Sequence, residues 1–186
     1  PPKYKGLVCA HFETLEDSLL GNLVALKHKP TAIELMDDTI LQCTKENIEQ
    51  NKNRFFVKGD PGALLMIEFS FVTEKELTDT AAALEKDFRD AGLGYYFPLI
   101  TGADNIKRVW ALRTAGLGLL SNVPGDRKGV PGIEDTAVAP EYLPEYVADF
   151  KKILRKLGLT SIYYAHIATG EIHFRPLINF KDPADV

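Results

Sequence analysis

The sequence Ser161-Ile-Tyr-Tyr-Ala-His-Ile-Ala-Thr-Gly-Glu-Ile-His-Phe-Arg-Pro176 predicts a β-hairpin late in the chain. Two runs rich in β-branched and aromatic residues flank Thr169-Gly170, which is a turn signal. If these two residues form the loop, His166 lies opposite His173 on the neighbouring strand. Because side chains alternate between the two faces of a strand, one face of the hairpin is apolar and the other carries polar groups that could form a site.

The polar face of this hairpin is the first candidate site, and it carries Tyr164, His166, His173 and Arg175. Directly opposed residues have Cβ atoms about 4.5 to 5.5 Å apart, so two imidazoles could share a metal ion or an anionic ligand. Two histidines alone do not make a metal site, because Zn²⁺ or Mn²⁺ needs at least one further protein ligand. A hydrogen-bonded histidine pair therefore remains the alternative to a metal site.

Strand and helix patterns alternate along the rest of the chain. Thr14 and Thr73 each follow a predicted strand and precede a helix, with an acidic residue three positions later, as in a capping box. The run 63–71 is the most apolar and fits a central strand buried on both faces. Strands are predicted at 5–12, 31–36, 63–71 and 95–101, and helices at 14–28, 37–51, 73–91, 104–120 and 140–157.

The order strand, Thr-capped helix, strand occurs twice, which predicts the fold class. We expect an α+β fold: a ferredoxin-like split β-α-β antiparallel sheet with helices packed on one face, plus the C-terminal β-hairpin. An open α/β sheet of parallel strands is the alternative.

Arg113 is the second candidate site residue. The predicted helix 104–120 has an apolar stripe at spacings of three and four, and Arg113 falls within it. A buried guanidinium needs an anion, so Arg113 either pairs with a carboxylate of this chain or holds an acidic ligand. The acids Glu134 and Asp135 could supply a carboxylate to the histidines, or they could simply be an exposed strand end.

Composition excludes several classes of partner. The chain of 186 residues has a net charge of −4 and no run of Lys or Arg, so nucleic acid and anionic membranes are not expected partners. No apolar stretch approaches the roughly 20 residues of a membrane span. We therefore expect a cytoplasmic protein. The chain begins at Pro1, and Asp182-Pro183 would start a helix just before its end, so residues 1–186 are predicted to be a single domain excised from a larger protein.

Four segments together resemble a known family. They match, in order and spacing, the C-terminal (cap) domain of FAD-linked oxidases, a group that includes glycolate oxidase flavoprotein subunits, D-lactate dehydrogenases and D-2-hydroxyglutarate dehydrogenases. The chain is most similar to the branch in which an iron-sulfur region is fused downstream. The segments are Trp110-Ala-Leu-Arg113, Asn122-Val-Pro-Gly-Asp126, Ile133-Glu-Asp-Thr-Ala-Val-Ala-Pro140 and Ala165-His-Ile-Ala-Thr-Gly-Glu-Ile-His173.

The resemblance implies a function. FAD would lie in an upstream domain, and this domain would cover a D-2-hydroxy acid that is oxidised to the 2-oxo acid. Arg113 matches the arginine that binds the substrate carboxylate, and His166 and His173 match two histidines that hold a divalent metal, Zn or Mn. The third metal ligand is expected in a downstream segment beyond Val186. Arg175, on the same hairpin face, completes the predicted substrate-binding residues.

Under this hypothesis the chain is part of an enzyme and has no activity alone. Its partners are its own FAD domain, a C-terminal region that could carry an iron-sulfur cluster, and the small hydroxy acid. The alternative function is a ferredoxin-like small-molecule-binding or regulatory module without catalysis, which the absence of a flavin domain upstream would favour.

Overall fold

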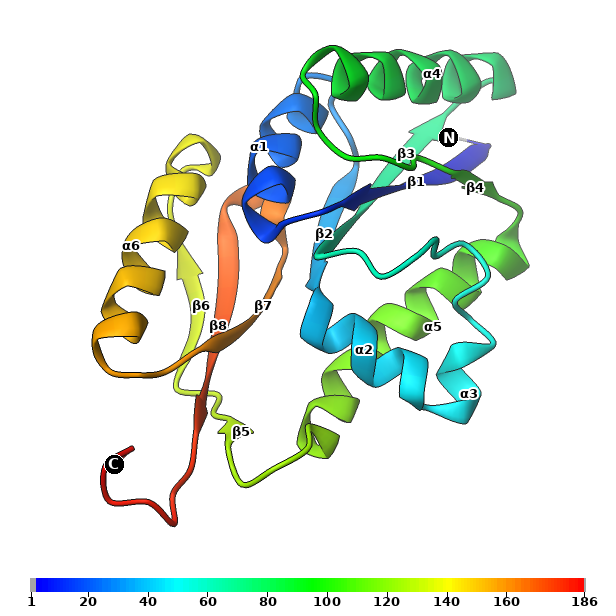
Figure 1. Cartoon of the computed structure of the whole chain (residues 1–186). Coiled ribbons are helices and arrows are strands. Elements are labelled where there is room, and N and C mark those ends of the chain that lie inside the picture. Colours follow the sequence, from blue (N-terminus) through cyan, green and yellow to red (C-terminus); the bar gives the residue numbers. More distant parts are fainter. Residues whose placement is uncertain (1–2, 186) are drawn as a thin grey trace.

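The computed structural model describes residues 3–185 and has a mixed α+β architecture (Figure 1). Both β1 and β2 pair antiparallel with β3, and β4 pairs antiparallel with β1. Each of the helices α1 and α4 therefore joins two strands that have a third strand between them, which confirms the split β-α-β prediction. These elements are β1 (Tyr4–Phe12), α1 (Leu15–Leu26), β2 (Ala32–Asp37), β3 (Ala63–Phe71), α4 (Glu74–Asp90) and β4 (Leu99–Thr101).

The two threonines begin their helices as the sequence predicts. The Thr14 hydroxyl accepts a hydrogen bond from the backbone N–H of Asp17. Thr73 and Glu76 form a reciprocal capping box at the start of α4. These caps satisfy backbone N–H groups that have no partner within the helix, and they fix where each helix leaves its strand. Among residues 3–185, no helix has both the length and the apolar character needed to cross a bilayer.

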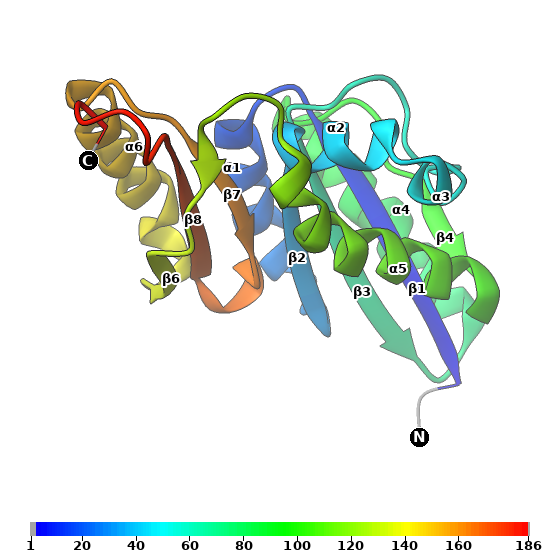
Figure 2. The ribbon, with the colours of Figure 1, turned by 90° about the horizontal axis from the view of Figure 1, so that it is seen from below.

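The second face of the sheet is also covered, although the sequence predicted helices on one face only. α2 (Asp38–Glu46), α3 (Ile48–Asn51) and α5 (Ala103–Leu119) lie on the face opposite α1 and α4, and Figure 2 shows α2 and α5 in front of the strands. The physical reason lies in the strands themselves. β3 is apolar on both faces, so each face needs a helical layer, and two separate hydrophobic clusters result.

The C-terminal part of the chain extends the sheet beyond β2, in the order β4-β1-β3-β2-β7-β8-β5, with β6 also paired to β8. α6 packs beside α1. The added elements are β5 (Lys128–Gly129), β6 (Ile133–Ala137), α6 (Leu143–Lys156), β7 (Ser161–Ala165) and β8 (Glu171–Ile178). The register between β2 and β7 runs over Leu35–Ala165 and Met36–Tyr164, whereas β1 and β3 pair along their whole lengths.

The hairpin β7–β8 forms as predicted, but its register differs by two residues. His173 lies opposite Tyr164 rather than His166. Thr169 resists the positive φ that a two-residue turn would require, so residues Ile167–Thr169 form a 3₁₀ turn and Gly170 alone adopts a positive φ of 80°. An even shift keeps every side chain on its predicted face, so the apolar face still packs into the core beneath α1 and α6.

Gly170 is expected to be intolerant of substitution. A Cβ at this position would lie 1.8 Å from the carbonyl oxygen of Val138, and the backbone φ of 80° disfavours side chains. We expect Gly170→Ala to lower the free energy of unfolding by at least about 2 kcal/mol. Urea unfolding would measure the effect.

Gly118 provides the matched control for this substitution. It lies within α5, and a Cβ there would meet nothing within 4 Å. Gly118→Ala should therefore raise stability by roughly 0.5 to 1 kcal/mol, since alanine favours helix. Equal effects of the two substitutions would contradict the assigned loop conformation.

Candidate functional site

The predicted site residues meet on the sheet face that α5 covers. The rings of His166 and His173 have centroids 5.8 Å apart, and His173 stacks on Tyr164 at 4.4 Å. The guanidinium carbons of Arg113 and Arg175 lie 5.5 Å and 5.4 Å from the centre of the Tyr164 ring. Side chains from α5, β7 and β8 that are far apart in sequence are therefore gathered around a single tyrosine.

Arg113 is buried, with 7 % of its surface exposed, as its place in an apolar stripe predicted. Its Nη2 donates to Oε2 of Glu34 on β2 at 3.0 Å, so the guanidinium has an internal carboxylate partner. The Nε–H of Arg113 is buried and has no hydrogen-bond partner among the residues that the structure describes. A buried donor without a partner costs free energy, which an anion bound at this edge would recover.

His166 shares the same carboxylate. Its Nδ1 donates to Oε1 of Glu34 at 2.6 Å, although Glu34 lies 132 residues earlier in the sequence. Glu34 is therefore the centre of a chain of contacts from the arginine to the histidine. The hairpin's polar pattern could not reveal it, because the contact depends on how β2 and β7 pair in the folded sheet.

His173 is 8 % exposed and is held from both sides. Its Nδ1 accepts from the backbone N–H of Asp135 at 3.3 Å, and its Nε2 lies 3.3 Å from Oε1 of Glu171. The Asp135 carboxylate is also near, with Oδ1 3.4 Å from Nδ1. Burial lowers the pKa of His173, which favours a neutral imidazole.

Arg175 also contacts the hydroxyl and the ring of Tyr164. Its Nη2 pairs with Oε1 of Glu134 at 2.6 Å, and its Nε–H donates to the Tyr164 hydroxyl at 3.1 Å. The Tyr164 hydroxyl in turn donates to Glu134 at 2.7 Å, which is the largest cause of the lowered pKa of Glu134. The acidic strand β6 therefore contributes to the site through Glu134 as well as Asp135.

Three potential metal ligands cluster at the hairpin. One ligand atom each from His166, Glu171 and His173 lies within 4.8 Å of the others. Two imidazoles and a carboxylate are a donor set that suits Zn²⁺ or Mn²⁺. Around them four carboxylates oppose two guanidiniums, which leaves an excess of two negative charges when the histidines are neutral. The donor set and the local charge both fit a divalent cation.

Glu171 is a candidate ligand that the sequence analysis did not name, since it expected the third ligand beyond Val186. A signal for it was present, because Glu171 is two residues before His173 and strand alternation places both on the same face.

The whole sequence matches one protein family. Residues 1–186 match the family described as "FAD linked oxidases, C-terminal domain". The chain belongs to this family. The predicted membership is therefore confirmed, and the family name implies FAD as the cofactor of the proteins that carry this domain.

Relatives of this FAD-linked oxidase C-terminal domain include D-2-hydroxyglutarate dehydrogenases. The protein from Pseudomonas putida is 32 % identical over 190 residues, covering 98 % of this chain and 19 % of its own length. The Escherichia coli protein is 25 % identical over 191 residues, with the same coverage of 98 % and 19 %. The chain thus spans about a fifth of the length of the curated relatives that it matches.

Solved structures share the fold of this FAD-linked oxidase domain. Substrate-bound p-cresol methylhydroxylase aligns with a TM-score of 0.61 at 15 % identity, covering 100 % of this chain and 41 % of that one. Alkyldihydroxyacetonephosphate synthase aligns with a TM-score of 0.58 at 13 % identity, covering 94 % and 36 %. At such identities the likeness establishes the fold alone.

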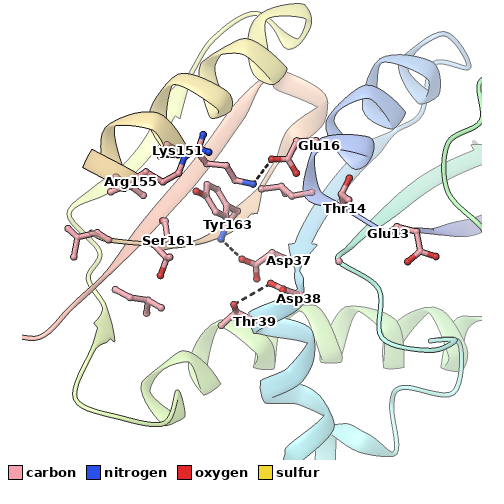
Figure 3. Close-up of a pocket in the computed structure, with 16 residues that line it drawn as sticks. Glu13, Thr14, Glu16, Asp37, Asp38, Thr39, Lys151, Arg155, Ser161 and Tyr163 are labelled. Atoms are coloured by element: carbon pink, nitrogen blue, oxygen red, sulfur yellow. Dashed lines mark hydrogen bonds and ion pairs between the residues drawn. The ribbon is translucent and has the colours of Figure 1, made fainter. Parts of the chain in front are cut away.

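This FAD-linked oxidase domain also has a cleft of about 580 Å³ that the sequence did not predict. It lies between the start of α1, the start of α2 and the C-terminal half of α6 (Figure 3). Lys151 reaches across one side to Glu16, and the Asp37 carboxylate accepts from the backbone N–H of Tyr163. The lining residues do not include the histidines or the two arginines of the candidate site.

Asp37, which lines this cleft, is expected to make stability depend on pH. Burial raises the pKa of Asp37 to about 7, although hydrogen bonds from backbone N–H groups, such as those of Ile40 and Tyr163, oppose the shift. Because the folded state then holds a proton that the unfolded state has lost, the stabilisation falls as pH rises from about 4 to about 7. Between pH 5 and pH 8 this should lower the free energy of unfolding by roughly 2 to 3 kcal/mol.

Asp37→Asn is the control, since asparagine does not titrate. Guanidinium unfolding of both proteins at pH 5 and pH 8 separates Asp37 from the other carboxylates. The free energy of unfolding of wild type should fall relative to that of Asp37→Asn between pH 5 and pH 8. A constant difference between the two proteins would contradict the raised pKa of Asp37.

Proposed function

We propose that this chain covers the substrate in a flavin-dependent dehydrogenase that oxidises a D-2-hydroxy acid to the 2-oxo acid. The observation that carries the proposal is the meeting of Arg113 with the group His166, Glu171 and His173 on one face of the sheet. An arginine suits a carboxylate, and a metal-binding group suits the neighbouring hydroxyl. The relatives named D-2-hydroxyglutarate dehydrogenase support this chemistry, and family membership favours it over a regulatory module.

In this proposal residues 1–186 are one domain of a longer flavoprotein. FAD lies mainly in an upstream domain and would accept the hydride from C2 of the substrate. The relatives are about five times as long as this chain, which leaves room for a further C-terminal region such as an iron-sulfur one. The domain's partners are then these other regions of its own protein and the small hydroxy acid.

The residues of this chain would bind and orient the substrate. The Nε–H edge of Arg113 would take the C1 carboxylate, since it is a buried cationic donor without a partner. Both arginines lie near the Tyr164 ring, which would set the position of the substrate, with Arg175 and Glu134 holding its hydroxyl. A substrate fixed in this way needs little further reorientation before reaction, which lowers the entropic part of the barrier.

The divalent metal that polarises the substrate hydroxyl in this proposal would be held by His166, Glu171 and His173. When bound there, Zn²⁺ or Mn²⁺ would lower the pKa of the substrate's 2-hydroxyl. A neutral His166 would have its lone pair on Nε2, because its Nδ1 proton is donated to Glu34. For Nε2 of His173 to bind the metal, the ring proton would have to move to Nδ1, which would give up the hydrogen bond that it accepts from the backbone N–H of Asp135. The Asp135 carboxylate, 3.4 Å from Nδ1, could then accept that proton.

The visible absorption spectrum of the flavoprotein that contains this chain tests the function. D- and L-2-hydroxy acids are added one at a time without oxygen. Bleaching of the flavin band by a D-acid, with the L-enantiomer as matched control, is the expected result. A protein without a flavin spectrum would contradict the proposal, and so would bleaching by L-acids alone.

A further inference from the structure

Glu34 connects the two halves of the candidate site. It lies on β2, its side chain is 14 % exposed, and each carboxylate oxygen has its own partner. Oε1 accepts from Nδ1 of His166 at 2.6 Å, and Oε2 accepts from Nη2 of Arg113 at 3.0 Å. Neither partner is near Glu34 in sequence, so the contact exists only in the folded sheet.

The contact with Glu34 determines which tautomer a neutral His166 ring adopts. A carboxylate can only accept a hydrogen bond, so a neutral His166 must carry its proton on Nδ1. The lone pair is then on Nε2, which is the nitrogen that remains for a ligand. The ring is otherwise exposed, so this hydrogen bond is what restrains its orientation toward His173 and Glu171.

The second carboxylate oxygen of Glu34 restrains the orientation of the Arg113 guanidinium. Because Glu34 takes Nη2 of Arg113, the guanidinium is held in place while its Nε–H remains without a partner. Charge balance is also met locally, since one carboxylate compensates one buried guanidinium.

We propose that Glu34 is a positioning residue that aligns Arg113 and His166 with each other through its single carboxylate. It fixes His166 in the tautomer with the proton on Nδ1, and it holds the Arg113 guanidinium at a fixed position relative to His166, Glu171 and His173. The inference rests on the proposed function only in assigning His166 and Arg113 to a common site.

The test compares Glu34→Gln with wild type in the 186-residue chain. A glutamine can accept only through its one oxygen, so it cannot serve both Nδ1–H and the guanidinium. Glu68→Gln is the matched control, because Glu68 is also a largely buried glutamate, on the adjacent strand β3, and pairs with Lys5 at 3.2 Å. Circular dichroism melting confirms that each variant folds.

Two readouts are made. Nitrogen-15 NMR of the imidazoles, without metal, should show the Nδ1–H form of His166 in wild type and in Glu68→Gln, and a loss of this preference in Glu34→Gln. Calorimetric titration with Zn²⁺ should show about 10- to 100-fold weaker binding in Glu34→Gln only, as is typical when a group behind a metal ligand is removed.

The outcomes separate this inference from the proposed function. If wild-type His166 carries its proton on Nε2, Glu34 is not its positioning residue, whether or not Glu34→Gln folds. Unchanged tautomer and Zn²⁺ affinity in Glu34→Gln would also overturn the inference. If Zn²⁺ does not bind wild type while the tautomer depends on Glu34, the metal site fails and the positioning role stands.

Discussion

Replacing Arg113 with alanine is expected to lower kcat/KM of the flavoprotein for its 2-hydroxy acid by about 30- to 5000-fold, with a raised KM. The guanidinium is buried, and its Nε–H has no partner within residues 3–185, so it is placed to take a carboxylate. Removing one member of a desolvated, charged hydrogen-bonded pair costs about 2 to 5 kcal/mol, which sets this range. Steady-state kinetics on the full-length protein would measure the change.

Two further variants make the Arg113 result interpretable. Alanine also leaves the Glu34 carboxylate without its guanidinium, which lowers stability, so Arg113→Lys is tested beside it. Lysine keeps the charge and loses the planar pair of donors, so an intermediate loss is expected. Arg108→Ala is the control on the same helix, because Arg108 contacts Asn53 and Phe55 outside the site. An unchanged kcat/KM in Arg113→Ala would remove Arg113 from substrate binding.

The double substitution His166→Ala and His173→Ala is expected to reduce the affinity of the chain for Zn²⁺ by more than about 100-fold. Both rings supply atoms to the cluster with Glu171, and one carboxylate alone binds a divalent metal weakly. Zn²⁺ titration by calorimetry and metal analysis after dialysis would measure the loss. Chelation of metal from the wild-type flavoprotein should lower its activity, and adding Zn²⁺ or Mn²⁺ back should restore it.

His28→Ala serves as the control for the histidine substitutions. His28 is largely buried and pairs with Asp87 at 2.8 Å, away from the hairpin. Its loss should leave Zn²⁺ affinity unchanged. If the double variant binds Zn²⁺ as tightly as wild type, the metal is held elsewhere and the hairpin histidines form only a structural pair.

Local sequence signals predicted most of the elements. Thr14 and Thr73 cap their helices as expected, and the doubly apolar run of β3 is a central strand. Boundaries were less predictable. The helix expected at 37–51 is broken at Asn47, whose backbone is extended (φ −85°, ψ 121°) and whose side chain caps a new short helix. An asparagine can cap or continue a helix, and only tertiary contacts decide between the two.

Sequence patterns indicated much of the candidate site: the apolar stripe of the helix at 104–120 singled out Arg113, and the hairpin supplied the other candidates. Alternation placed His166, His173 and Arg175 on one face, and this arrangement survived the change of register because the change was even. The same alternation places Glu171 on that face, although the sequence analysis did not use it. Glu34 could not be found in this way, since its role depends on the pairing of β2 with β7 across more than a hundred residues.

The narrow junction between β2 and β7 has a mechanical consequence. Glu34 lies on one side of this junction and His166 on the other, while the shared register there covers Leu35–Ala165 and Met36–Tyr164. A sheet bends most easily where its strands share the fewest ladder bonds. Bending of the sheet at the β2–β7 junction would change the distance between Arg113 and the histidines more than distortion on either side of the junction would. A ligand that contacts both Arg113 and the histidines would therefore reduce this bending.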